Sequence, residues 1–104
     1  MPSSRPAPQN ANREAIAALR DDAEQVALRL SGDDIDSDLQ ELGEHLARLE
    51  ASCDDLAKAS RGTWKTRLTA SRKHFHEARD LLDDGEPADA VALEVMAGRE
   101  GLRN

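Results

Sequence analysis

The one grouping with metal-ligand character in this sequence is the run His74, His76 and Glu77. If this stretch is helical, positions 74 and 76 point about 200° apart, so the two imidazoles cannot hold one ion together. His76 and Asp80, four residues apart, form half of a site, which His45 or a second subunit would have to complete. We therefore expect no metal site and no bound cofactor.

Nucleophiles are also scarce in the chain. Cys53 is the only cysteine, so no internal disulfide can form. It falls inside an apolar heptad pattern, far from the helix N-terminus that would activate a thiol, which predicts a buried structural side chain. The serines have no histidine in a suitable sequence context, and no glycine-rich phosphate loop is present. We expect no catalytic residue and no enzymatic activity.

Trp64 is the sole tryptophan, and it stands among cations directly after a Gly-Thr break. One interpretation makes it a core residue with a cation resting on its ring. The other makes it an exposed anchor for a partner, since Trp and Arg are enriched at interface hot spots. Both remain open from the sequence. The candidate partner interface consists of Trp64, Arg61, Lys65, Arg67, Arg72 and Lys73.

Helices must position these residues, because the composition disfavours a sheet. Tyrosine is absent, isoleucine occurs twice and valine three times, while Ala, Leu, Glu, Asp and Arg dominate. The 104 residues suffice for one domain. We predict an all-α fold, a small helical bundle built on an antiparallel, coiled-coil-like helical hairpin, with a disordered N-terminal tail. The predicted segments are the tail 1–11, a single helical domain 12–97 with helices 12–31, 36–61, 63–84 and 87–97, and a frayed C-terminus 98–104.

Apolar residues recur at three- and four-residue spacings in each predicted helix. The first stripe is Ile16, Leu19, Ala23, Val26 and Leu30. The second is a heptad seam of Leu39, Leu42, Leu46, Leu49, Cys53 and Leu56, which Ile35 and Ser60 extend. The third is Trp64, Leu68, Ser71, Phe75, Ala78 and Leu82. In the last helix, Val91 and Val95 are expected to pack on the bundle, with Leu93 and Met96 as further candidates.

The spacing slips between Leu56 and Leu68, where every step is four residues. Gly62 can end one helix and Thr63 can cap the next, so we favour a tight hairpin at this point. The alternative is one continuous helix over about residues 36–83 that absorbs the slip as a stutter.

Charge is segregated along the chain, although the net charge is −7. Residues 33–55 contain nine acids and one base, whereas residues 58–79 contain seven bases and one acid. Antiparallel segments of opposite sign would pair along a hairpin, so we expect the basic run to complement the acidic one inside the fold. Such exposed pairs set register more than they add stability.

The predicted function is that of a non-catalytic helical protein–protein interaction module. Only twenty large apolar residues lie between Asn12 and Ala97, which favours self-association or assembly into a larger complex. The expected partners are a second copy or another protein, in the cytoplasm; a nucleic-acid partner is disfavoured by the overall charge, and no membrane is expected. Two alternatives are an acidic inhibitor that mimics nucleic acid through Asp33, Asp34, Asp36 and Asp38, and a nucleic-acid-binding protein that uses residues 58–79.

Overall fold

The computed structural model describes the backbone of residues 6–31 and 39–103, and side chains from residue 13 onward within those ranges. The described residues form four α-helices and no strand, which confirms the all-α prediction. They are α1 (Pro6–Leu30), α2 (Leu39–Lys58), α3 (Gly62–Asp83) and α4 (Ala88–Glu100).

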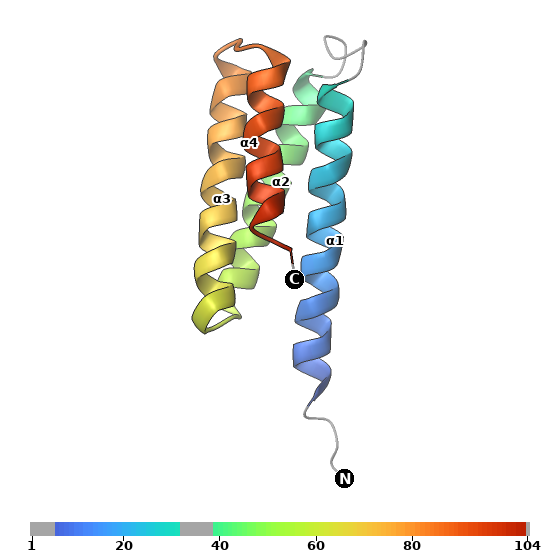
Figure 1. Ribbon diagram of the computed structural model, residues 1–104, viewed down its shortest axis with the longest axis vertical. Helices are drawn as coiled ribbons and strands as arrows, with labels where there is room; N and C mark the ends of the chain where they lie inside the picture. Colours follow the sequence, from blue (N-terminus) through green and yellow to red (C-terminus); the bar gives the residue numbers. More distant parts are fainter. Residues whose placement is uncertain (1–5, 32–38, 104) are drawn as a thin grey trace.

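The helices alternate in direction and form an elongated bundle with extents of 54 × 21 × 20 Å (Figure 1). Each helix packs on its neighbours in the chain, and α4 returns beside α1 to close the ring. The most extensive packing is between α2 and α3. The core therefore lies along the bundle axis, and every helix keeps an outer face toward solvent.

Helix α1 begins at Pro6, six residues before the predicted start at Asn12. Prolines at positions 6 and 8 suit the first turn, because the N–H groups there have no partner within the helix. The first turns project beyond the other helices (Figure 1). The predicted stripe of α1, from Ile16 to Leu30, is buried throughout.

The hairpin between α2 and α3 is present, and the continuous helix is not. Helix α2 ends at Lys58, and Gly62 opens α3 with φ of +65°, a backbone conformation that strongly favours glycine. The predicted cap at Thr63 is wrong: Arg61 occupies the N-cap position, and its side chain makes no capping hydrogen bond. The proposed start of α2 near residue 36 lies outside the described residues.

The heptad seam supplies the α2 side of the core. Leu42, Leu46, Leu49 and Cys53 are buried, and Leu56 is partly buried against the same cluster. Leu39 is the exception, because it opens the helix and is 42% exposed. Ile35, the predicted seam residue before it, is outside the described residues. The third stripe, on α3, is buried from Leu68 to Ala78 and partly buried at Trp64 and Leu82.

The C-terminus differs most from the sequence prediction. Helix α4 continues to Glu100, three residues past the predicted end, and Leu102 beyond it is fully buried. Arg67 of α3 donates from Nε to the carbonyl oxygen of Gly101 at 2.9 Å and from Nη2 to that of Arg103. Described residues 98–103 are therefore docked on the bundle.

A close approach between α3 and α4 explains this docking. Ser71 Oγ donates to the carbonyl oxygen of Gly98 at 2.8 Å. A Cβ atom on Gly98 would lie 2.6 Å from Cε1 of Phe75, and one on Gly101 would lie 2.6 Å from Ser71 Oγ. The two glycines are needed because they leave room for α3, although in the sequence they resemble helix breakers.

Two of the candidate core residues in α4 face outward. Val91 and Val95 are fully buried as predicted, whereas Leu93 is 69% exposed and Met96 is 48% exposed. The stripe of α4 that faces the core is narrow. It runs through Val91, Val95, Gly98 and Leu102 at three- and four-residue spacings, so Leu93 and Met96 fall outside it.

Candidate protein-interaction surface

The basic run on α3 meets the acids of α2 at one place, around Glu50. Arg79 Nε lies 2.9 Å from Glu50 Oε2, and His76 Nδ1 lies 2.9 Å from Oε1 of the same carboxylate. The Glu50 side chain is only 12% exposed, so the charge pair is partly desolvated. The Arg79 contact is one of charge, because within the described residues Oε2 accepts no aligned hydrogen bond.

The expected charge pairing along the hairpin is otherwise absent from the described residues. Of the seven cations in residues 58–79, Arg79 alone has an α2 carboxylate within 4.0 Å from across the hairpin. Lys58 pairs within its own helix, with Asp54 at 3.1 Å. Register accounts for part of this, since the antiparallel arrangement puts Glu41 and Glu44, at the start of α2, beside the end of α3 and away from its first cations.

Trp64 and Arg67 act together inside the fold. Trp64 is partly buried against the core cluster, and the guanidinium carbon of Arg67 lies 4.1 Å from the centroid of its ring. This geometry is a cation–π contact. Because Arg67 also holds the C-terminal carbonyls, both residues contribute to packing between α3 and the end of the chain.

The remaining candidates have no such role. Arg61, Lys65 and Lys73 are exposed, and among the described residues none of them has a carboxylate within 4.0 Å. We call these three residues the α3 cation face. Arg72 is half-buried and also has no ion pair with any described carboxylate.

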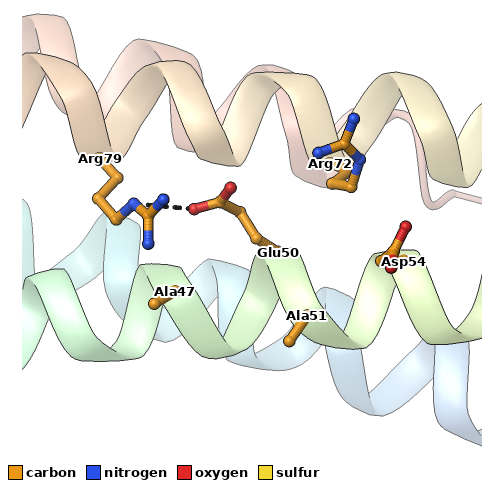
Figure 2. Close-up of a pocket in the computed structure, with 6 residues that line it drawn as sticks. All are labelled: Ala47, Glu50, Ala51, Asp54, Arg72 and Arg79. Atoms are coloured by element: carbon orange, nitrogen blue, oxygen red, sulfur yellow. Dashed lines mark ion pairs between the residues drawn. The ribbon is translucent and has the colours of Figure 1, made fainter.

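Arg72 lines an open groove of about 310 Å³ between α2 and α3. Figure 2 shows Arg79 and Glu50 pointing toward each other across this groove, with Arg72 and Asp54 further along. Ala47 and Ala51 complete its α2 wall. The groove is lined by two carboxylates, two guanidinium groups and two alanine side chains, which can make electrostatic and hydrogen-bonding contacts.

The other residues that could react or bind a metal are either buried or already in contact with carboxylates. Cys53 is fully buried, and burial raises the pKa of its thiol from 9.0 to about 12, which keeps it protonated and unreactive. His76 also contacts Asp80, at 3.4 Å, so carboxylates lie beside both ring nitrogens. His74 Nδ1 lies 3.2 Å from Glu94 of α4. Across residues 6–31 and 39–103, no three His, Cys, Asp or Glu side chains are grouped to hold a metal ion.

Burial also lowers the pKa of His45 on α2 below the ordinary 6.5. The positive charges of Arg48 and Arg29 act in the same direction, and Asp22 opposes them. Among the described residues, no group of three possible metal ligands contains His45 and His76.

Two partly buried charged residues were missed by sequence reasoning. Glu50 follows seam residue Leu49 and joins α2 to α3, and Arg99 joins α4 to α1 through Glu24 at 2.8 Å. A signal for both is their place beside the apolar stripe, where a long charged side chain can cover the core edge. The acids proposed to imitate nucleic acid, at 33, 34, 36 and 38, lie outside the described residues.

Within the described parts of the chain, no helix combines the length and apolar character that crossing a membrane requires. Comparison with protein-family models, with curated proteins and with solved structures found no match to this chain.

Proposed function

We propose that this protein is a non-catalytic helical interaction module that binds a protein partner through the α3 cation face. The observation that supports this is the lack of described carboxylate partners for Arg61, Lys65 and Lys73. The chain carries 21 acids against 14 bases, yet the fold leaves these three cations without an ion pair within its described part. Their placement is then best explained by something outside the monomer.

Binding is favoured over catalysis by the state of the reactive groups. The only thiol is enclosed and protonated, and the imidazoles of His74 and His76 lie against carboxylates. The groove between α2 and α3 is lined by carboxylates and guanidinium groups, with no thiol, hydroxyl or imidazole among its lining residues. A rigid bundle with a charged outer face can provide orientation and specificity for a partner.

The test is affinity capture from a lysate of the source cell, with the wild type compared with Arg61→Glu/Lys65→Glu/Lys73→Glu. A matched control is Arg13→Glu/Arg48→Glu, which reverses exposed cations on α1 and α2. We expect specific proteins to be captured by the wild type and the control and lost with the triple variant, while circular dichroism shows all three folded. Equal capture by the triple variant would refute the proposal.

Nucleic-acid binding is the second candidate, because unpaired cations on one helix also suit phosphates. It is less favoured, since Arg67, Arg79 and Lys58 of the same run are engaged within the fold. A gel shift with mixed-sequence DNA or RNA that weakens steeply as salt rises, and that the triple variant loses, would support this candidate over the first.

A further inference from the structure

The outer face of α3 carries both signs of charge, one in each half of the helix. Six residues at spacings of four and three follow this face, and all six are exposed: Thr66, Ala70, Lys73, Glu77, Asp80 and Asp84. Lys65 adds positive charge on one flank of the first half, and Asp83 adds negative charge on the same flank of the second. The face is therefore cationic toward the α2–α3 turn and anionic toward the α3–α4 turn.

We propose that two copies of this protein associate side by side through this face, with their α3 helices antiparallel. The inference rests on the proposed function and names the partner of the α3 cation face as a second copy of the chain. Antiparallel pairing sets the cationic half of each helix against the anionic half of the other. A single two-fold axis forms both of these charge contacts at once, and the result is a closed dimer.

The charge pattern also selects a register. When Lys73 lies opposite Glu77 of the second copy, symmetry creates the same pair a second time, and Lys65 and Thr66 fall beside Asp84 of the second copy. Ala70 then lies opposite Asp80 of the second copy, where its small side chain allows the helices to approach. A parallel arrangement would instead face Lys73 with Lys73 and Asp80 with Asp80.

Within one chain, Lys73 and Glu77 do not form an ion pair with each other. They are spaced i and i+4, the arrangement in which helical ion pairs commonly form. Their side-chain charges nevertheless lie more than 4.0 Å apart, as neither has an ion pair with another described residue. Both charges are therefore available to a second copy.

Ionic strength must affect this dimer in a specific way. Two chains of net charge −7 repel each other at long range. At about 0.1 M salt the Debye length is about 10 Å, so this repulsion is screened while contacts at ion-pair distance persist. At about 1 M salt it is about 3 Å, and the pairs themselves are screened. We expect the dimer at about 0.1 M salt and its loss at about 1 M.

Sedimentation equilibrium over the micromolar range, with charge-reversal variants, tests the inference. Lys73→Glu and Glu77→Lys each replace two attractive pairs with two repulsive ones, so each variant alone should dimerise at least about tenfold more weakly. In a mixture, position 73 of the first variant (Glu) faces position 77 of the second (Lys), and the unchanged Glu77 of the first faces the unchanged Lys73 of the second. Both contacts are attractive, so heterodimers should form with wild-type affinity. The matched controls are Arg48→Glu and Glu44→Lys, an exposed i, i+4 pair on α2, which should dimerise as the wild type does.

Three results would overturn the inference. They are a wild type that stays monomeric at about 0.1 M salt, single variants that dimerise as well as the wild type, and a mixture that fails to restore dimers. Melting curves for each variant exclude loss of folding as the cause. If the dimer fails while affinity capture still depends on the α3 cation face, the interaction function stands and only the identity of the partner is rejected.

Discussion

Replacing Gly98 with alanine should destabilise this protein, whereas the same replacement at Gly43 should stabilise it. Both glycines lie inside helices, so the added methyl group lowers backbone entropy in the unfolded chain at each site. Their surroundings differ. A Cβ on Gly43 would meet Cδ2 of Leu82 at 3.8 Å, an ordinary contact, while one on Gly98 would lie 2.6, 2.9 and 3.0 Å from three ring carbons of Phe75.

The magnitudes follow from these distances. Alanine is favoured over glycine in a helix interior by about 1 kcal/mol, and this gain should appear in full for Gly43→Ala. Overpacking a well-filled core costs about 1–3 kcal/mol, and Phe75 is fully buried, so its ring has no solvent-filled space to enter. Gly98→Ala should therefore be less stable than Gly43→Ala by about 1–3 kcal/mol. In melting temperature this is a separation of about 4–8 °C for each kcal/mol.

Urea unfolding followed by circular dichroism measures both free energies of unfolding. A second comparison in the Phe75→Leu background isolates the ring contact, because removing the ring carbons should relieve the cost of alanine at position 98. If Gly98→Ala proves as stable as Gly43→Ala, or if its cost is unchanged without the ring, the close packing of α4 on α3 is not the reason for glycine at this position.

The remaining predictions concern three other buried or partly buried side chains. Leu102→Ala should lower the free energy of unfolding, measured with urea, by about 2–5 kcal/mol, because the side chain is fully buried. Leu93→Ala on the exposed face should change it by less than about 0.5 kcal/mol. Equal effects would mean that the C-terminus is not docked. Burial lowers the pKa of His45 in the folded state, so as the pH falls the unfolded chain binds a proton at this residue before the folded protein does. The contribution of neutral His45 to the free energy of unfolding is therefore complete above about pH 6.5 and decreases as the pH falls through the folded pKa. His45→Gln should accordingly flatten the dependence of unfolding free energy on pH between about 7 and 5, and an unchanged slope would contradict the assignment. The thiol of Cys53, with a pKa of about 12, should react with a thiol-specific chromogenic reagent only as fast as the bundle opens; rapid labelling of the native protein would show that it is accessible.

The fold class and most of the core could be predicted from the sequence because apolar periodicity records burial directly. The stripes from Ile16 to Leu30 and from Leu42 to Cys53 read as helical faces and are buried. Gly62 could be identified as a hairpin residue because its positive φ is a local property of the chain. In contrast, Gly98 and Gly101 look like breakers in sequence, and their packing against Phe75 and Ser71 depends on another helix, at residues 23 and 30 positions earlier in the chain.

The candidate site was harder to predict, because charges act across helices whose register a sequence does not contain. Segments of opposite sign suggested a row of pairs, yet only Glu50 meets a cation of α3 from across the hairpin within the described residues. Arg67 could not be recognised as a ligand of the C-terminal carbonyls, since that contact spans 34 to 36 positions in the chain. The α3 cation face emerges only after such internal partners have been assigned.

The ring of helix neighbours has a consequence for how the chain reaches this structure. Three of the four neighbouring pairs join consecutive helices, and the pair α1–α4 alone joins the two ends. Closing a short loop costs less chain entropy than closing a long one, so the hairpin of α2 and α3 should nucleate folding and α1 should meet α4 last. We expect the α1–α4 contact, which forms last, to be also the first to open. Local unfolding should then transiently expose the surface between α1 and α4.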